Sequence, residues 1–361
     1  MHRIPLLPLG TILILSVTAV AQRPDGAPPR RGGRGPGRQI ELRELALKHF
    51  VMQHVTVEAP SLQSGKLDCV VYTPAIPEPE KDADGKPSTK AADDSPLPVV
   101  LWLHGLNDGN WRFHNEGGAA TLEALRDRGE IGDMIVVAPT VARQTMYLDG
   151  ESNGKVETAI AHDLLDWVTK TYPRAQKDAA HHAIMGVSMG GYGAMKIAMH
   201  HPELFGVVAV HSAAILPADP DDLPAQFEQM RDRMTRGLGV AEVLGDPIDK
   251  DKWAAQMPMA MLDAMPKEKL AALRIYFDVG TRDRYGLTAP NQAFDAALTK
   301  KEIAHTFRLV EDGGHSWGSE SMSDNLEQSF RFVGAAFAAK VEKATPAASA
   351  PAATPAAGHG R

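Results

Sequence analysis

Short apolar runs alternate with amphipathic helical segments along most of the chain. Apolar runs predict buried strands at 98–103, 134–138, 183–185, 207–211, 274–279 and 306–310. Helical spacing predicts helices over 121–128, 156–172, 189–200, 293–298 and 326–341. This strand–helix alternation predicts an α/β fold with a mostly parallel sheet and helices on both faces.

The first part of this pattern differs from the rest. We expect a short lead helix over 41–50, followed by strands over 53–58 and 67–73 that are joined by a polar turn. A short polar turn between two strands favours an antiparallel pair. With this pair the predicted sheet has eight strands.

One segment, 217–272, interrupts the alternation. It contains several short helical pieces that are rich in methionine (Met230, Met234, Met257, Met259, Met261 and Met265). Its size and place predict a small helical cap over a site. Methionines there can form an adaptable apolar lining or simply pack against the body, and the pattern leaves both interpretations open.

The two ends of the chain differ from its centre in composition. A short positive start, an apolar run and the small residues Ala19-Val20-Ala21 predict a signal peptide over 1–21, although a retained anchor is the alternative. Such a signal predicts a secreted or periplasmic protein without stable membrane insertion after cleavage. The predicted organisation is a signal peptide at 1–21, a disordered Pro/Gly/Arg-rich linker at 22–40, an α/β domain at 41–342 and a disordered Ala/Pro-rich tail at 343–361.

Composition narrows the function classes. The 361 residues are 43% hydrophobic, which is ample for a core, and the net charge of -7 argues against general binding to nucleic acid. The chain has one cysteine, Cys69, so no disulfide can form within it. Cys69 lies in an alternating apolar stretch, which favours a buried structural role.

A Gly-x-Ser-x-Gly pentapeptide, Gly186–Gly190, stands where a predicted strand meets a predicted helix. A serine on so sharp a turn is strained, and side chains at the two glycine positions would collide with the strand or the helix. The turn would expose the hydroxyl of Ser188 and place the N–H of Met189 at the positive end of the new helix. We therefore expect Ser188 to be a nucleophile.

An activated serine needs a base and an acid that orients this base. In open α/β sheets such groups lie past the carboxyl ends of the strands. Asp283 and His315 each follow a predicted strand in this way, whereas Asp278, the competing acid, lies within its strand. The order Ser188, Asp283, His315 is the serine–acid–histidine order of α/β-hydrolases.

The oxyanion of a tetrahedral intermediate needs two preorganised N–H donors. We expect these from Met189 and from Leu106, because Gly105 allows the loop after the strand 98–103 to turn inward. Trp111 and Trp317 flank this loop and the histidine, which makes them candidate substrate-binding residues, although either side chain could simply pack against the sheet. Asn107 and Asp108 in the same loop are too weak a signal to predict a cation site, and solvation of the loop is the favoured interpretation.

The quoted motifs together resemble the esterase family of α/β-hydrolases. They are LWLHGLNDGNW, GVSMGGYGAM with HPELFG, GTRDRYG and DGGHSW, and the resemblance covers roughly 53–338. That family includes esterase D (S-formylglutathione hydrolase), feruloyl and acetyl-xylan esterases, enterochelin esterases and mycolyltransferases. The resemblance implies an α/β-hydrolase fold, with Ser188 as nucleophile, Asp283 as acid, His315 as base, and Leu106 and Met189 as oxyanion donors. Segment 217–272 carries no substrate signature of the family.

These features predict a serine carboxylesterase that forms an acyl-enzyme. The expected substrate is a small-molecule or polysaccharide-linked ester, and neither a cofactor nor a metal is implied. The export signal and the single cysteine argue against a cytosolic formylglutathione role. An acyltransferase of mycolyltransferase type remains the alternative, and a non-catalytic binding protein on the same scaffold is a third hypothesis. A serine peptidase has no supporting feature.

Overall fold

The computed structural model describes residues 40–76, 94–142, 145–223, 240–315 and 324–339. All helices and strands in it belong to one compact unit that begins at Glu41. The predicted signal peptide, linker and tail lie outside the described residues, as do Met230 and Met234. Within the described ranges, no helix has the length and apolar character needed to cross a membrane.

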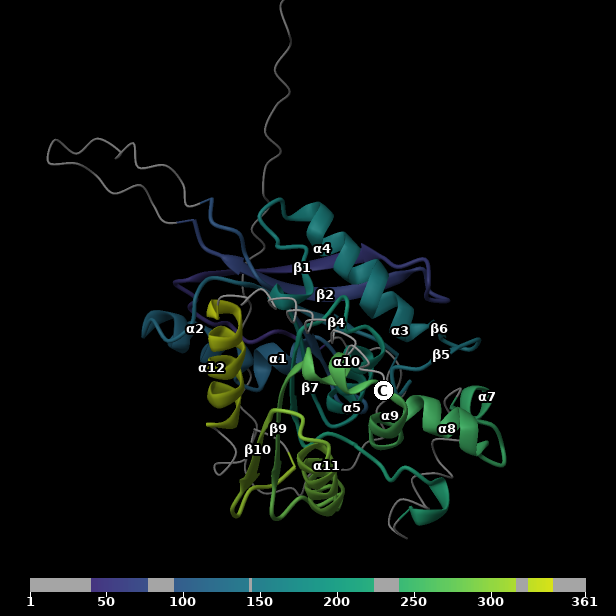
Figure 1. Cartoon of the computed structure of the whole chain (residues 1–361). Helices are drawn as coiled ribbons and strands as arrows, with labels where there is room; N and C mark the ends of the chain where they lie inside the picture. Colours follow the sequence, from purple (N-terminus) through teal and green to yellow (C-terminus); the bar gives the residue numbers. More distant parts are fainter. Residues whose placement is uncertain (1–39, 77–93, 143–144, 224–239, 316–323, 340–361) are drawn as a thin grey trace, which may run out of the picture. The chain divides into compact units, whose positions relative to one another are not determined.

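Eight strands form the main sheet, in the order β1-β2-β4-β3-β7-β8-β9-β10 (Figure 1). Their bounds are Phe50–Glu58 (β1), Lys66–Pro74 (β2), Val99–Leu103 (β3), Ile135–Thr140 (β4), His182–Val187 (β7), Val207–His211 (β8), Arg274–Gly280 (β9) and His305–Val310 (β10). Strand β2 pairs antiparallel with β1 and β4, and every other neighbouring pair is parallel. The predicted mostly parallel eight-stranded sheet and its antiparallel opening pair are therefore confirmed.

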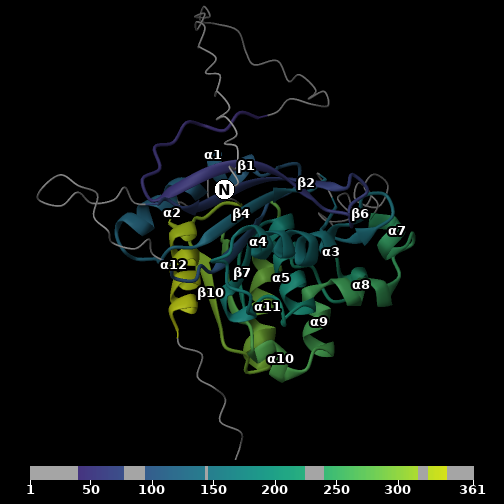
Figure 2. The same ribbon diagram turned by 90° about the horizontal axis from the view of Figure 1, so that it is seen from above.

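Helices cover both faces of this sheet (Figures 1 and 2). One face packs against α1 (Trp111–Asn115), α2 (Gly118–Asp127) and α12 (Asn325–Ala338). The other face packs against α3 (Val156–Thr158), the π-helical turn η1 (Ala159–Leu164), α4 (Leu165–Thr171), α5 (Met189–His200) and α11 (Thr288–Lys300), with α7 (Val240–Leu244), α8 (Lys250–Gln256), α9 (Pro258–Ala264) and α10 (Lys267–Ala271) beside them. The short 3-10 turns are η2 (Ala179–His181) and η3 (Pro220–Asp222).

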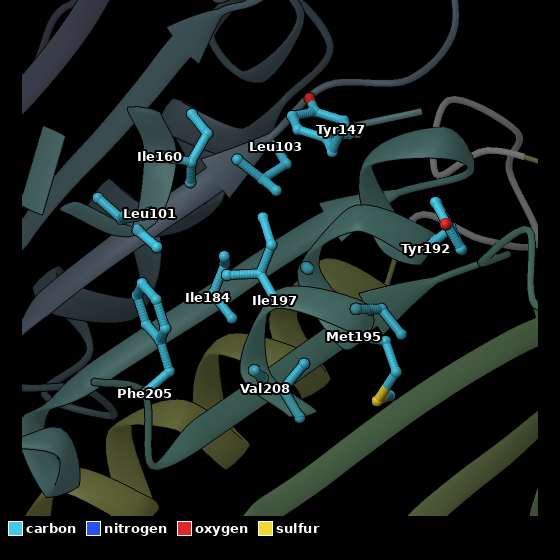
Figure 3. Packing of buried hydrophobic residues seen from close by; sticks show 14 of the residues in the cluster. Leu101, Leu103, Tyr147, Ile160, Ile184, Tyr192, Met195, Ile197, Phe205 and Val208 are labelled. Atoms are coloured by element: carbon cyan, nitrogen blue, oxygen red, sulfur yellow. The ribbon is translucent and has the colours of Figure 1, made fainter. Parts of the chain in front are cut away.

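Strand β3 is apolar and buried at every position because both faces of the sheet are covered there. In β3, Val99 and Leu101 join the cluster under α5, whereas Val100 and Trp102 join the cluster under α12. Successive side chains of a strand point to opposite faces, so a continuous apolar run fills two cores at once. Figure 3 shows the first core, where Ile197 of α5 lies beside Leu101 and Ile184.

The lead helix expected over 41–50 is absent, and that prediction is wrong. Residues 40–47 have no regular structure, and Phe50 already begins β1. The N–H of Arg43 donates to Asn115 Oδ1 at 2.9 Å, and the N–H of His49 donates to Glu123 Oε1 at 2.8 Å. Because side chains of α1 and α2 satisfy these backbone groups, an extended chain forms in place of a helix.

The other long elements agree with the pattern, and short helices lie in 217–272 as predicted, whereas a few other short elements have no sequence signal. The helix predicted over 156–172 is continuous from α3 through η1 to α4, although its middle turn is π-helical. Helix α1 and the two-residue strands β5 (Asp149–Gly150) and β6 (Gly154–Lys155) had no sequence signal long enough to predict them. Cys69 is fully buried in the core, as expected.

The described part of segment 217–272 packs as a row of short helices. Met257 and Met261 are buried in the core under α5, and Met259 and Met265 pack against the same cluster. This burial favours core packing over an adaptable lining for the described methionines. That the segment covers a site stays a prediction.

Candidate active site

Ser188 occupies a sharp turn between β7 and α5, with φ 58° and ψ -117°. Such a backbone conformation costs a non-glycine residue about 1–3 kcal/mol and persists only where its surroundings enforce it. Its N–H donates to the carbonyl of His211 at 2.9 Å, and its own carbonyl accepts the N–H groups of Tyr192 at 2.9 Å and Ala214 at 3.1 Å. Hydrogen bonds to the neighbouring strand β8, to the chain after it and to helix α5 thus hold the turn in place.

The two glycines of the pentapeptide make this turn possible. A Cβ on Gly186 would lie 2.5 Å from the carbonyl oxygen of Gly190. A Cβ on Gly190 would overlap the carbonyl of Leu103 in the neighbouring strand. Both atoms in contact are backbone atoms, which cannot move aside. The collision expected from the sequence therefore explains why both positions are glycine.

The structure brings Ser188, His315 and Asp283 into one hydrogen-bonded chain. Nε2 of His315 lies 2.9 Å from Ser188 Oγ, and Nδ1 lies 2.8 Å from Asp283 Oδ2. An ionised carboxylate can only accept, so Nδ1 carries the hydrogen and Nε2 is left to accept from the serine hydroxyl. The acid follows β9 and the histidine follows β10, and these parallel strands end at the same sheet edge as β7.

The carboxylate of Asp283 is fully buried but remains ionised. Burial, the largest influence, raises its pKa, but the hydrogen bond and charge of His315 and the N–H groups of Tyr285 and Leu287 together lower the pKa below its usual value. The N–H of Tyr285 reaches Oδ1 at 2.8 Å. Both carboxylate oxygens are thus engaged, which holds the negative charge beside the imidazole.

Asp278, the competing acid, takes part in a different arrangement. It is fully buried in β9, where one carboxylate oxygen lies 2.9 Å from His211 Nδ1 and accepts the hydroxyl of Tyr276 at 2.8 Å. On its other side, His211 Nε2 lies 3.1 Å from Ser329 Oγ. The geometry thus assigns Asp283 to His315, and Asp278 to a buried network behind the sheet edge.

The expected oxyanion donors lie beside the serine. Met189 is the first residue of α5, and the first four N–H groups of a helix have no partner within that helix. A Cβ on Gly105 would lie 3.6 Å from the Cβ of Ser188, so the loop that carries Leu106 passes directly alongside the turn. The structure therefore places the start of α5 and the loop that carries Leu106 beside the serine, and the role of the two N–H groups as oxyanion donors stays a prediction.

His104 holds this loop in place, a role that sequence reasoning did not anticipate. Its Nε2 accepts the N–H of Val141 at 3.1 Å, so Nδ1 carries the hydrogen and donates to the carbonyl of Gly105 at 2.8 Å. That carbonyl and the N–H of Leu106 belong to the same peptide plane. Burial lowers the pKa of His104 and keeps the ring neutral, as this pair of hydrogen bonds requires.

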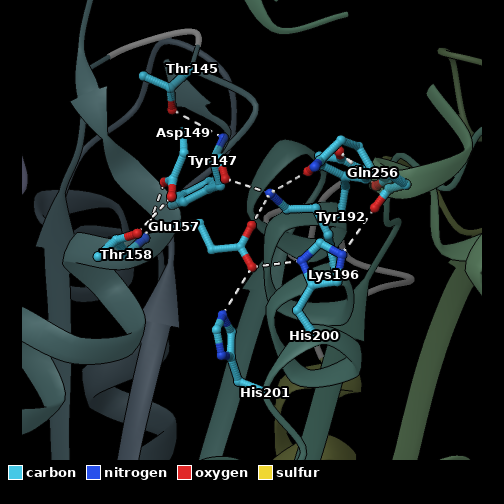
Figure 4. Close-up of polar contacts among 11 residues, drawn as sticks. Thr145, Tyr147, Asp149, Glu157, Thr158, Tyr192, Lys196, His200, His201 and Gln256 are labelled. Carbon is cyan, nitrogen blue, oxygen red and sulfur yellow. Dashed lines mark hydrogen bonds and ion pairs between the residues drawn. The ribbon is translucent and has the colours of Figure 1, made fainter. Parts of the chain in front are cut away.

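A buried lysine of α5, Lys196, lies at the centre of a polar network (Figure 4). Lys196 of α5 is fully buried, and its Nζ lies 2.7 Å from the carbonyl of Tyr147, 2.6 Å from Glu157 Oε2 and 3.2 Å from Gln256 Oε1. All three ammonium donors are therefore used. The hydroxyl of Tyr147 in turn donates to the carbonyl of His104 at 3.0 Å, which links the lysine to the loop that carries Gly105 and Leu106 (the oxyanion loop).

The side chains on the face of α5 that carries Lys196 also hydrogen-bond to the carboxyl end of α8. The hydroxyl of Tyr192 donates to the carbonyl of Gln256 at 3.0 Å, and Nε2 of His200 lies 3.0 Å from the carbonyl of Ala255. Together with Lys196, these residues recur every four positions along the helix, which places them on one face. The inserted segment is therefore anchored to the nucleophile helix by polar contacts as well as by apolar packing.

The remaining candidates are less fully placed. Trp111 begins α1, and a Cβ on Gly109 would lie 3.2 Å from its ring, so part of the ring packs against its own loop. Trp317 lies outside the described residues.

The loop residue Asp108 pairs with Arg112 at 3.2 Å. Over the ranges that the structure describes, no group of three or more His, Cys, Asp or Glu residues is arranged to hold a metal ion.

Strand order, serine turn and hydrogen-bonded chain together define an α/β-hydrolase. Comparison with known proteins makes the assignment narrower: residues 87–330 match the family described as "Putative esterase", and the chain belongs to that family.

Similar proteins include both enzymes and an antigen. S-formylglutathione hydrolase of Paracoccus denitrificans is 27% identical over 264 residues, which cover 66% of this chain and 85% of that protein. The MPT51/MPB51 antigen of Mycobacterium tuberculosis is 31% identical over 123 residues, which cover 33% of this chain and only 40% of the antigen. The chain thus matches less than half the length of that relative.

Solved structures show the shared fold. A ferulic acid esterase has a TM-score of 0.61 and 24% identity, and the match covers 80% of this chain and 99% of that one. FphF of Staphylococcus aureus, a fluorophosphonate-binding serine hydrolase, has a TM-score of 0.60 and 17% identity, with 79% and 99% covered. At these identities the likeness to the two solved structures shows the fold alone.

Proposed function

We propose that this protein is a serine carboxylic-ester hydrolase that acts through an acyl-enzyme on Ser188. The observation that carries the proposal is the continuous chain from Ser188 Oγ through His315 to Asp283, with distances of 2.9 and 2.8 Å. Membership of the esterase family supports it. A nucleophile, a base and an orienting acid within hydrogen-bond reach are what acyl transfer to a serine requires.

In the first half of the reaction, Ser188 Oγ attacks the ester carbonyl while His315 Nε2 takes the hydroxyl proton. The carbonyl oxygen becomes an oxyanion that accepts hydrogen bonds from the N–H groups of Met189 and Leu106. Each such donor is worth about 3 kcal/mol in the transition state. When the intermediate collapses, the proton on Nε2 passes to the leaving alcohol, and Asp283 stabilises the imidazolium throughout.

In the second half, a water molecule takes the place of the alcohol. His315 Nε2 removes its proton as it attacks the acyl-enzyme, and the same N–H donors stabilise the second oxyanion. Collapse then releases the acid and restores the Ser188 hydroxyl. Trp111 is proposed to contact the substrate beside the loop that carries Leu106. A secreted or periplasmic location is proposed from the signal peptide predicted over 1–21.

The proposal is tested with purified protein and esters of several classes. We expect turnover of 4-nitrophenyl acetate or butyrate, acetylated xylan or methyl ferulate, and covalent labelling by a fluorophosphonate probe at Ser188. Substitution Ser188→Ala removes both, whereas Ser212→Ala, a control at a buried serine near the turn, retains labelling.

Labelling that survives Ser188→Ala would remove this residue from its role. Absence of both turnover and labelling in the wild-type protein would instead favour a binding protein on a hydrolase scaffold. Adding a sugar acceptor separates the transferase alternative, because an acyltransferase forms an acylated sugar faster than it releases the free acid.

A further inference from the structure

The loop that carries Asp283 also presents two exposed side chains, Arg284 and Tyr285. Tyr285 keeps 45% of its surface exposed, which is unusual for a large side chain beside a candidate active site. Its ring meets the imidazole of His315 edge-to-face, with 4.3 Å between the ring centres and 75° between the planes. One edge of this exposed aromatic ring is therefore part of the wall around the base.

Arg284 lies on the ring of Tyr285. Its guanidinium carbon is 4.9 Å from the ring centre, and Nη2 donates to the tyrosine hydroxyl at 3.2 Å. Taken with the contact between the rings of Tyr285 and His315, this places the guanidinium carbon within about 9 Å of the centre of the imidazole. Stacking on an aromatic ring and a hydrogen bond together restrict a side chain that would otherwise move freely.

The charge of Arg284 has no partner within the described part of the chain. The neighbouring arginine, Arg282, pairs with Asp312 across the same loop, whereas no described carboxylate pairs with Arg284. The acid of the site is engaged elsewhere, because Asp283 accepts from His315 and from the N–H of Tyr285. Among the described residues, one of the five guanidinium N–H donors of Arg284 has a partner, the hydroxyl of Tyr285, and the other four have none.

We propose that Arg284, held on Tyr285, recognises an anionic group of the ester substrate. This inference rests on the proposed function and adds a substrate class to it: esters that carry a carboxylate several bonds from the scissile carbonyl. Guanidinium is well suited to this role because it binds carboxylates bidentately and is weakly hydrated. The carboxylate belongs to either the acyl part or the alcohol part, and matched substrates distinguish these two sources.

The test compares charged esters with neutral esters of the same shape. For the acyl part, the pair is mono-4-nitrophenyl glutarate and its methyl-capped diester. For the alcohol part, the pair is 4-acetoxybenzoate and 4-acetoxybenzamide. We measure kcat/KM for each pair in wild-type protein, in Arg284→Gln, in Tyr285→Phe and in the control Arg282→Gln, at low ionic strength and in 0.5 M salt.

In at least one pair, Arg284→Gln is expected to lower the charged-to-neutral ratio of kcat/KM about five- to tenfold, as for a partly exposed charged hydrogen bond. The loss should appear in KM, since the anion lies away from the reacting atoms. It should shrink in high salt. Tyr285→Phe, which removes the hydroxyl partner and keeps the ring, should lower the ratio less, and Arg282→Gln should leave it unchanged.

If Arg284→Gln leaves the charged-to-neutral ratio of kcat/KM unchanged for both pairs, this inference is overturned. Turnover of the neutral esters would still support the proposed function in that case. An equal fall in Arg282→Gln also overturns it, because the effect is then one of general surface charge. If wild-type protein turns over no ester of either pair and no ester of the earlier panel, the proposed function itself fails, and this inference fails with it.

Discussion

His104 and Leu106 are coupled through a single peptide plane. The imidazole of His104 donates to the carbonyl of Gly105 at 2.8 Å, and the nitrogen of that same peptide is the N–H of Leu106. The other ring nitrogen is fixed by the N–H of Val141 in the loop after β4. The proposed oxyanion donor is thus oriented by a side chain that need not touch the substrate.

The first prediction concerns His104→Phe, which keeps a ring and loses both hydrogen bonds. We expect kcat to fall about 10- to 100-fold with little change in KM, because a misdirected oxyanion donor weakens only transition-state binding. Steady-state kinetics on folded protein checks this, and His54→Phe at an exposed histidine of β1 is the control. A change in KM alone would show that His104 shapes the substrate pocket.

The second prediction separates the two acids of β9 and its loop. Asp283→Asn should lower kcat by about four orders of magnitude, because the imidazole loses its orienting carboxylate. Asp278→Asn should lower the free energy of unfolding by about 3–5 kcal/mol, since it breaks the buried pair with His211. Kinetics and denaturant unfolding of both variants check this. If the activity of the folded proteins ranks the other way, Asp283 is not the acid.

The third prediction concerns the buried pair of Lys196 and Glu157. Lys196→Met removes the buried cation that faces this carboxylate and leaves it with only the partly exposed His200 and His201, so we expect the free energy of unfolding to fall by about 3–5 kcal/mol. Adding Glu157→Gln should recover part of the loss. Lys170→Met, which removes an exposed pair with Asp166, is the control and should cost less than about 1 kcal/mol. Equal losses at the two lysines would refute this account of the pair.

The fourth prediction concerns pH. The hydrogen bond to Glu157 is the largest influence on His201 and raises its pKa; burial opposes this, and the charges of Glu157 and Glu203 add to it. A folded-state pKa above the unfolded value of about 6.5 means that the stabilisation is complete below that pH and is lost as pH rises through the higher value. The stability difference between wild type and His201→Gln should therefore be larger at pH 6 than at pH 9, as measured by urea unfolding.

The fifth prediction concerns export. The charged start, apolar run and small-residue site predict cleavage after Ala21, so the exported protein should begin at Gln22. Intact-mass measurement of protein from the extracellular or periplasmic fraction checks this. Recovery of a form that still contains Met1 in the membrane fraction would support the retained anchor.

Most of the fold could be predicted because the strands are short, apolar and separated by periodic helices. Strand β8 was predicted at its observed bounds, and α5 was predicted from the serine turn to His200. The segment over 41–50 was misread because its backbone partners are side chains more than 70 residues away, including Asn115 and Glu123. Local propensity contains no information about such partners.

The site residues could be predicted only where a reactive side chain comes directly after the end of a predicted strand. Ser188, Asp283 and His315 satisfy that rule, and the structure brings them together. His104 and Gly105 follow β3, and the prediction of the oxyanion loop uses only the glycine. The role of Lys196 could not be predicted, because its burial with Glu157, 39 residues away, leaves no local trace in the sequence.

The buried network behind the sheet edge has a consequence for recognising active sites by shape. Ser329, His211 and Asp278 reproduce the serine–histidine–acid connectivity, at 3.1 and 2.9 Å, and all three are fully buried. A search by interatomic distances alone would therefore return two triads from this one chain. Backbone conformation separates them: Ser329 lies inside α12 and gives its hydroxyl hydrogen to the carbonyl of Leu326, whereas Ser188 stands on a left-handed turn with its hydroxyl directed at the base. In this molecule, the position of the main chain distinguishes Ser188, the proposed nucleophile, from Ser329.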